Sequence, residues 1–205
     1  MALIDHLINE GWLKAPRIIE AFRRIKRVDF LPKDLEDLAE LNEALPIGYG
    51  QTISQPLVVV FMLEQLEPKE GDKILDIGSG SGWTSALLGE IVGKKGRVIA
   101  IDVIPELVEF GKNNVAKYNF IEKGIVEFIC ADGSKGYQKE APYDGILVSA
   151  AVQTEVPRAW KEQLKIGGRI VTPIGSSIWL FTKKSESKFE EIEYPGFAFV
   201  PLISK

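Results

Sequence analysis

The chain has 205 residues, with 25 Lys and Arg, 29 Asp and Glu, and 45% hydrophobic residues. This composition is typical of a globular protein and excludes disordered, collagen-like and disulfide-rich classes. The net charge of −4 argues against nucleic-acid partners, because bulk binding to phosphates requires a basic surface. The single cysteine, Cys130, cannot close an intrachain disulfide, which favours a reducing, cytoplasmic location.

A membrane partner is not expected either. The N-terminal sequence MALIDHLINEGW carries acidic and polar residues where a secretory signal would have an apolar core. No later apolar run approaches the roughly 18 residues that a membrane span requires. We therefore expect a single domain over residues 1–205 that is neither secreted nor anchored.

The first third of the chain is predicted to be mainly helical. Apolar residues recur there at near-helical spacing, with interruptions near Gly11 and Pro16. A short acidic helix is predicted over Asp34–Asn42, and a loop rich in Pro, Gly and Thr over Pro46–Pro56. The apolar run Leu57–Leu66 predicts a further helix, although its three consecutive valines leave a strand as an alternative.

From Lys73 onward, short apolar runs alternate with helical segments, which is the pattern of a parallel sheet covered by helices. We predict strands at Lys73–Ile77, Arg97–Ile101, Ile125–Cys130, Gly145–Ser149 and Gly168–Pro173, and helices at Thr84–Val92, Ile104–Tyr118 and Val156–Leu164. Ser177–Lys183 and Lys188–Glu193 predict an antiparallel hairpin at the sheet's edge. The predicted fold is therefore α/β, with a doubly wound, mostly parallel, Rossmann-like sheet, an N-terminal helical extension and an antiparallel C-terminal edge.

This pattern also divides the chain into three parts. Residues 1–68 are expected to form a helical cover that contains the Pro46–Pro56 loop, and residues 69–175 a ligand-binding core. Residues 176–205 are expected to form a C-terminal hairpin.

A glycine-rich segment connects the first predicted strand of the core to the helix that follows. Its sequence is LDIGSGSGW, residues 75–83. Glycines allow a sharp turn and a close approach to a ligand, and the free N–H groups that open a helix can bind an anionic group. A tight turn without any ligand would show the same pattern. Trp83 stands where a dinucleotide fingerprint has its last glycine, which argues against NAD.

Three acidic residues lie at the ends of three successive predicted strands. Asp76 precedes the first glycine and would attract an ammonium group rather than a pyrophosphate. Asp102 ends the next strand, where open α/β sheets present an acid to ribose hydroxyls. Asp132 comes after the third strand. For Asp102 taken singly, a solvated strand-end carboxylate is the alternative, but the three acids together favour a ligand site.

At these residues the chain resembles S-adenosylmethionine-dependent methyltransferases, and more specifically the protein-L-isoaspartate O-methyltransferase family. The further motifs that carry the resemblance are GYGQTIS (48–54), ADGSKGY (131–137), APYD (141–144) and QLKIGGR (163–169), with RVDFLP (27–32) and FVPL (199–202) towards the two ends. The resemblance thus covers nearly the whole chain.

The resemblance implies an S-adenosylmethionine cofactor held by the core (69–175), and isoaspartyl-containing peptides and proteins as substrates. It implies that Ser54 and Thr52 border the reaction as catalytic residues, in an acceptor loop carried by the helical cover (1–68). We also expect a monomer and, because His6 has no second His and no Cys at ligand spacing, no metal. The residues implied to hold the cofactor are Asp76, Gly78, Ser79, Gly80, Gly82, Asp102, Val103, Asp132 and Gly133. The implied reaction is methylation of the α-carboxylate of L-isoaspartyl residues, which begins the repair of damaged proteins.

The chain departs from the family pattern beside the acceptor. The family usually continues Thr-Ile-Ser with Ala-Pro-His-Met, whereas here Gln55-Pro56-Leu57-Val58 follows Ser54. A methyltransferase with a different acceptor is therefore one alternative. A cofactor-binding protein without turnover is a second, and an NAD-linked oxidoreductase, disfavoured by Asp76 and Trp83, is the last.

A carboxylate acceptor explains the shortage of histidine and cysteine. It is already ionised near neutral pH, so methyl transfer to it requires alignment rather than a general base. Ser54 is then expected to orient the acceptor by hydrogen bonding, and its alternative role, like that of Thr52, is to satisfy loop backbone groups or to cap the next helix.

Other polar or aromatic residues receive structural interpretations. His6 is predicted to be a surface residue and Cys130 to be packed inertly within its strand. Trp83 either covers the cofactor or packs on the sheet. The basic cluster, Arg23, Arg24, Lys26 and Arg27, is predicted to be a solvated helix face.

Overall fold

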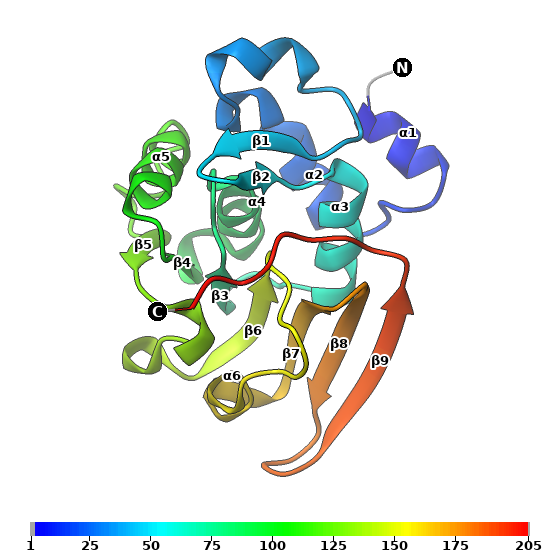
Figure 1. Cartoon of the computed structure of the whole chain (residues 1–205), viewed down its shortest axis with the longest axis vertical. Coiled ribbons are helices and arrows are strands. Elements are labelled where there is room, and N and C mark those ends of the chain that lie inside the picture. Colours follow the sequence, from blue (N-terminus) through cyan, green and yellow to red (C-terminus); the bar gives the residue numbers. More distant parts are fainter. Residues whose placement is uncertain (1–2, 205) are drawn as a thin grey trace.

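The computed structural model describes residues 3–204, and a seven-stranded sheet forms its centre (Figure 1). The strand order is β5-β4-β3-β6-β7-β8-β9. The strands are β3 (Lys73–Ile77), β4 (Arg97–Asp102), β5 (Val126–Cys130), β6 (Tyr143–Val148), β7 (Leu164–Ile174), β8 (Ser177–Lys183) and β9 (Phe189–Pro195). Strands β3 to β7 pair in parallel, whereas β8 and β9 pair antiparallel to their neighbours. The predicted mostly parallel sheet with an antiparallel edge is confirmed.

Strand β3 is the point at which the chain reverses direction across the sheet. The chain passes from β3 to β4 and β5 on one side, then returns to β6 on the other side of β3. Ligand crevices in open α/β sheets lie outside the carboxyl ends of the strands at such a switch point. The glycine-rich segment leaves β3 at this place.

Apolar side chains alternate between the two faces of the sheet and build two core clusters. Helices α3 (Pro56–Leu66), α4 (Trp83–Val92) and α5 (Pro105–Ala116) cover the first face. The other face is covered by α6 (Arg158–Gln163) and the short 3-10 helices η4 (Gly133–Lys135) and η5 (Gln138–Glu140). Trp160 is fully buried there, and its indole N–H donates to the Gly133 carbonyl at 2.8 Å. Both faces of the sheet are thus covered by helices.

The N-terminal part lies over the carboxyl ends of the strands (Figure 1). It contains α1 (Leu3–Asn9), α2 (Pro16–Arg24), the 3-10 helices η1 (Arg27–Phe30) and η2 (Lys33–Leu38), and strands β1 (Leu45–Gly48) and β2 (Gln51–Ile53). A third 3-10 helix, η3 (Gly93–Lys95), follows α4.

Two sequence predictions in this part are wrong. The acidic helix expected over Asp34–Asn42 is the shorter 3-10 helix η2, in which Leu35 and Leu38, three residues apart, both pack against the core. The expected loop over Pro46–Pro56 is largely the hairpin β1–β2, whose turn residues Tyr49 and Gly50 both have positive φ. The helix predicted at Leu57–Leu66 is confirmed as α3, so the strand alternative is wrong.

The predicted C-terminal hairpin is confirmed as β8–β9, but the residues after it were not expected to return to the centre. They run back across the carboxyl ends of the strands (Figure 1). The Ala151 N–H donates to the Val200 carbonyl, and the Leu202 N–H donates to the Ala151 carbonyl, both at 2.8 Å. This C-terminal tail, residues 196–204, faces the β1–β2 hairpin across the strand ends. Across residues 3–204, no helix has the length and apolarity needed to cross a membrane.

Candidate active site

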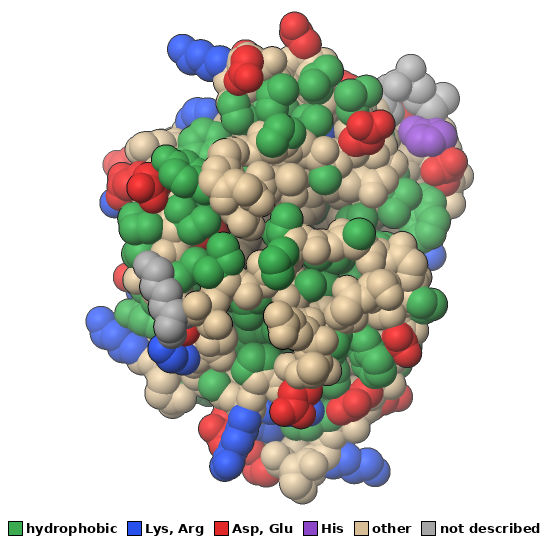
Figure 2. Space-filling view, viewed as in Figure 1, with side chains coloured by type: hydrophobic (Ala, Val, Ile, Leu, Met, Phe, Trp, Pro, Cys, Tyr) green, Lys and Arg blue, Asp and Glu red, His purple; other side chains and the backbone are tan. Residues whose placement is uncertain are grey.

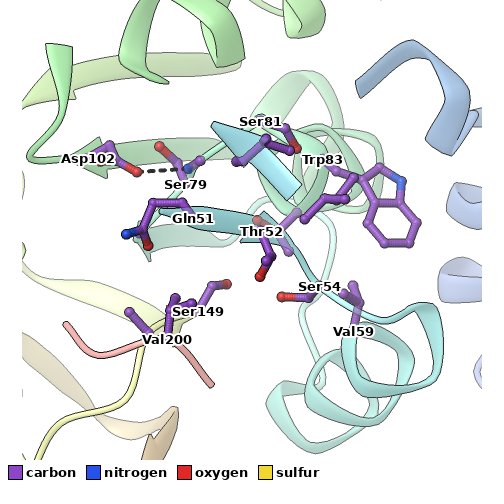
Figure 3. A pocket seen from close by; sticks show the side chains of 16 residues that line it. Gln51, Thr52, Ser54, Val59, Ser79, Ser81, Trp83, Asp102, Ser149 and Val200 are labelled. Carbon is purple, nitrogen blue, oxygen red and sulfur yellow. Dashed lines mark hydrogen bonds between the residues drawn. The ribbon is translucent and has the colours of Figure 1, made fainter. Parts of the chain in front are cut away.

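Two adjoining cavities open at the carboxyl ends of β3 and β4. Both are lined by Gln51, Gly78, Asp102 and Ala150, so they form one continuous crevice. The first lies between the β1–β2 hairpin and the glycine loop, and the second extends past β4 towards residues 201–203 of the tail. Figure 3 shows the first cavity and the side chains that line it.

The glycine loop forms the floor of this crevice. Gly80 has a φ of 49°, and a Cβ atom there would lie only 3.2 Å from Ile47 of the hairpin above. Gly78 and Ser79 line the crevice beside it. Gly82 differs, because a Cβ atom on it would lie 2.8 Å from the Gly111 carbonyl oxygen of α5. Gly78 to Gly80 therefore face the crevice, whereas Gly82 allows two helices to pack closely.

Asp102 lies between the two cavities. Its Oδ2 accepts a hydrogen bond from the Gly80 N–H at 2.9 Å, and its Oδ1 accepts one from the Ile104 N–H at 3.0 Å. The residue is only 8% exposed, yet it lines both cavities (Figure 3). Each carboxylate oxygen retains a lone pair for a further donor, so two adjacent hydroxyl groups of a ligand can bind here.

Asp76 lies in β3 and is fully buried. Its Oδ2 accepts hydrogen bonds from the hydroxyls of Thr84 at 2.9 Å and Ser85 at 2.6 Å. Its Oδ1 has no hydrogen-bond partner within residues 3–204. Burial raises the pKa of Asp76 to about 6, although both hydroxyls oppose that shift. The carboxyl group can therefore change charge when a cationic group approaches.

The carboxylate of the third acid, Asp132, is paired within its own turn. The Asp132 carboxylate accepts from the Ser134 N–H at 3.0 Å and from its hydroxyl at 2.7 Å, and it pairs with Lys135 at 3.2 Å. It thus caps η4, while the adjacent Gly133 lines the second cavity together with Val103. A Cβ atom on Gly133 would lie 2.4 Å from Cγ2 of Ile77, so only glycine fits against β3.

Oγ of Ser79 and Nε1 of Trp83, both on residues that line the first cavity, have no hydrogen-bond partner in the described part of the chain. Oδ1 of Asp76 is also unpartnered, but Asp76 lines neither cavity and lies behind Thr84, which does line the first. Leaving such a buried atom unpaired costs roughly 1–3 kcal/mol, so an unpaired atom on a residue that lines the crevice is a candidate contact for a bound polar ligand. Together with the glycine floor and Asp102, Oγ of Ser79 fits a ligand that carries a polar group at one end and a ribose at the other. The Asp76 carboxyl group behind Thr84 favours an ammonium as that polar group.

Trp83 is among the residues that line the first cavity, but its ring is directed away from the glycine loop. Its ring points from the loop towards the N-terminal helices (Figure 3) and meets Phe22 edge-on, with centroids 5.7 Å apart. Of its two proposed roles, packing is therefore the one that the ring position supports.

A third and larger cavity of about 620 Å³ lies between the start of α3 and the C-terminal tail. It meets the first cavity at Thr52, Ser54, Ser149 and Val200, which line both. Figure 3 shows the hydroxyls of the first three residues directed into the same space. None of the described residues that line this third cavity is charged. In Figure 2 the hollow of this face is bordered mainly by hydrophobic and uncharged groups.

Sequence reasoning missed Ser149. It follows β6 directly, and its N–H donates to the Ile77 carbonyl at 2.9 Å, so it belongs to the same sheet edge as the glycine loop. Its position at the end of the predicted strand Gly145–Ser149 is the sequence feature that could have identified it as a site residue. Gln55 and Leu57, where the sequence departs from the motif that it resembles, both line the third cavity.

The predictions for residues outside the crevice have mixed outcomes. His6 is exposed and lies 3.3 Å from Glu10, which confirms a surface position. Cys130 was expected to be packed but is exposed, because it ends the edge strand β5. Arg23 and Arg24 are exposed, as expected of a solvated helix face. Arg27 is buried, and its inclusion in that face is wrong. In the described part, no three His, Cys, Asp or Glu side chains are grouped so as to hold a metal ion.

The family model for protein-L-isoaspartate(D-aspartate) O-methyltransferase matches residues 1–205, the whole chain. The chain belongs to this family. A Methanopyrus kandleri protein-L-isoaspartate O-methyltransferase is 42% identical over 207 residues, which cover 99% of this chain and 90% of the relative. An Archaeoglobus fulgidus protein-L-isoaspartate O-methyltransferase 2 is 44% identical over 189 residues, which cover 91% and 84%.

Solved structures agree with this membership at the level of the fold. A Plasmodium falciparum structure that carries the protein-L-isoaspartate O-methyltransferase family's name was solved with S-adenosyl-L-homocysteine. It superposes with a TM-score of 0.89 at 21% identity, covering 99% of this chain and 97% of that chain. The methyltransferase fold predicted from the motifs is thus confirmed, and the NAD-linked alternative is disfavoured.

Proposed function

We propose that this protein is a protein-L-isoaspartate O-methyltransferase, which transfers a methyl group from S-adenosylmethionine to the α-carboxylate of L-isoaspartyl residues in damaged proteins. The observation that carries the proposal is the junction of the ligand crevice and the uncharged 620 Å³ cavity at three hydroxyl side chains. That junction can align a carboxylate with a methyl donor and contains no general base. Family membership and curated relatives at about 40% identity support the same activity.

The cofactor is assigned to the crevice on chemical grounds. S-adenosylmethionine, when bound, supplies a methyl group on a positively charged sulfur that leaves as a neutral thioether. Asp102 would hold the ribose hydroxyls, and the Asp76 carboxyl group, which lies behind Thr84 at the crevice wall, would attract the ammonium group. Gly78, Ser79 and Gly80 would line the amino-acid portion. Val103 and Gly133 line the second cavity, where the remaining part of the nucleoside would bind.

Gly82 and Asp132 are proposed to support the cofactor site without contacting the ligand. Gly82 lets α4 start close to α5, and Asp132 caps the turn that presents Gly133. A side chain at position 82, or loss of the Asp132 carboxylate, would therefore displace the loops that touch the cofactor.

The acceptor is assigned to the third cavity. Ser54, Thr52 and Ser149 would donate hydrogen bonds to the carboxylate or to the peptide groups beside it, which fixes one oxygen in line with the methyl group. A carboxylate is already ionised at neutral pH and requires no proton removal. Alignment of this kind contributes up to ~7–11 kcal/mol to rate enhancement in well-oriented systems.

The roles of the three segments follow from this assignment. We propose that residues 1–68 supply the acceptor loop, residues 69–175 hold the cofactor, and residues 176–205 close the acceptor cavity. We propose that the enzyme is a monomer. The lone, unpaired thiol of Cys130 supports a reducing, cytoplasmic compartment.

A paired-peptide assay tests the function. The protein is incubated with labelled S-adenosylmethionine and either an isoaspartyl peptide or the same sequence with normal aspartate. Base-labile methyl ester is expected on the isoaspartyl peptide only. Equal labelling of both peptides would point to another carboxylate acceptor. Tight binding of S-adenosylhomocysteine without any product would identify a binding protein without turnover.

A further inference from the structure

Arg27 is a buried cation that contacts backbone on both sides of the β1–β2 hairpin. It opens η1 and is only 7% exposed. Its guanidinium donates four hydrogen bonds to backbone carbonyls. Nη1 donates to Ala39 at 3.2 Å and Leu41 at 2.9 Å, and Nη2 donates to Glu43 at 2.7 Å and Ser54 at 3.3 Å. Three of these carbonyls precede the hairpin and one follows it, so Arg27 joins its two ends.

The same guanidinium also contacts the cofactor half of the site. It lies over the indole ring of Trp83, 5.4 Å from the ring centroid. Trp83 is the first residue of α4 and directly follows the glycine loop. Arg27 therefore connects the acceptor loop with the helix that starts at the floor of the cofactor crevice.

The chemistry of arginine suits this connection. Hydrogen bonds from an ionised donor are stronger than neutral ones, and a planar guanidinium can reach several separate acceptors while stacking on an aromatic ring. Burial lowers the pKa of Arg27 to about 10, opposed by the nearby charge of Glu40, so the side chain stays protonated at neutral pH. A lysine would place its three donors on one atom and reach fewer of these carbonyls.

We infer that Arg27 is a positioning residue that holds Ser54 in line with the cofactor crevice, an inference that rests on the proposed function. The carbonyl that Arg27 binds and the hydroxyl that faces the acceptor belong to the same residue. The segment before the hairpin braces the other side of the loop, because Asn42 Oδ1 accepts from the Leu57 N–H at 3.0 Å. Fixing these backbone groups sets where the Ser54 hydroxyl can lie.

The kinetic test compares Arg27→Met and Arg27→Lys with a matched control, Arg169→Met. Arg169 likewise donates to a backbone carbonyl, Gln65 at 2.7 Å, and pairs with Glu67 at 2.8 Å, but it lines none of the three site cavities. Active sites are counted by the stoichiometry of S-adenosylhomocysteine binding. Per active site, kcat is expected to fall ~30-fold for Arg27→Met, because a misplacement of about 1 Å costs up to ~100-fold.

Arg27→Lys is expected to lose less activity than Arg27→Met, and Arg169→Met to lose none. The dissociation constant of S-adenosylhomocysteine is expected to stay within about threefold in all variants, since Arg27 lines no part of the cofactor crevice. A purely structural role would lower the number of active sites and leave kcat per site unchanged. That outcome would overturn the inference.

Hydrogen exchange provides a readout that does not depend on turnover. Arg27→Lys is expected to speed amide exchange in the segment 43–54 selectively, without a change in β3 and β4. Unchanged exchange there would also overturn the inference, and this variant serves if Arg27→Met fails to fold. If the wild-type protein methylates no isoaspartyl peptide, the proposed function fails, while the exchange result still decides whether Arg27 fixes the loop.

Discussion

The Ser85 hydroxyl donates a hydrogen bond to Oδ2 of Asp76 at 2.6 Å inside the core. Oδ1 of the same carboxyl group has no hydrogen-bond partner in residues 3–204. The pairing stabilises one oxygen and leaves the other available. Because burial raises the pKa of Asp76 to about 6, the protonation of this one group can report whether a ligand cation binds beside it.

Cofactor binding is therefore expected to depend on pH. Below about pH 6 the free protein carries a neutral Asp76, and a ligand ammonium group favours its anion, so binding releases a proton. The affinity for S-adenosylhomocysteine should fall up to roughly tenfold per pH unit below 6 and level off above it. Calorimetry in two buffers of different ionisation enthalpy measures the released proton. An affinity for the wild-type protein that stays flat through pH 6 would contradict the assignment of Asp76.

The stability of the free protein should change in the opposite direction. A carboxyl group whose folded pKa is raised contributes stability that is fully present below its unfolded pKa and is lost as pH rises through about 6. Asp76→Asn removes the buried charge, so above pH 7 it is expected to be more stable than wild type by about 1–3 kcal/mol. Urea unfolding at pH 5 and pH 8 measures the difference, and a less stable variant at both pH values would show that the anion is well compensated.

Ser54→Ala and Ser149→Ala test the hydroxyl junction. Each removes one donor to the acceptor, so kcat/KM for an isoaspartyl peptide is expected to fall about 10- to 100-fold, with S-adenosylhomocysteine binding unchanged. Ser177→Ala is the matched control, because Ser177 is buried and donates to Glu193 at 2.7 Å on the far hairpin. Full activity in Ser149→Ala would remove that residue from the acceptor site.

Gly133→Ala tests the close contact beneath the second cavity. The new methyl group would lie 2.4 Å from Cγ2 of Ile77, so strain of about 1–3 kcal/mol and weaker cofactor binding are expected. Ile77→Ala removes that Cγ2 atom, and the double variant should lose less stability than the two single losses combined. Thermal unfolding with and without S-adenosylhomocysteine measures both effects. Strict additivity would show that the methyl group is accommodated elsewhere.

The parts of this protein that sequence predicts best are those set by local pattern. The strand Lys73–Ile77 and the glycine loop after it combine an apolar run with residues that permit a sharp turn, and both have the expected bounds. The acids that end or follow β4 and β5 are brought to one edge because parallel strands end together. Ser54 and Thr52 were found through the family motif, and the structure brings them to the same cavity.

What sequence missed depends on contacts between distant segments. The basic run around Arg27 has the composition of a solvated face, and only the position of carbonyls 12 to 27 residues further along the chain explains why this arginine is buried. Cys130 lies in an apolar strand, but its exposure depends on β5 being the last strand of the sheet. The hairpin β1–β2 was not predicted because its strands, of four and three residues, are too short to show a clear alternation of apolar and polar residues.

The return of the C-terminal tail makes assembly of the complete site a late step of folding. Val200 and Thr52 line the same cavity although roughly 150 residues of chain separate them, and closing so long a loop is entropically unfavourable until the intervening sheet has formed. Removal of residues 196–204 would leave the glycine floor and Asp102 in place, but it would open the second cavity, lined by residues 201–203, and the third, lined by residues 196–200. Binding of the nucleoside and of damaged proteins would then both wait for the tail to dock on the completed sheet.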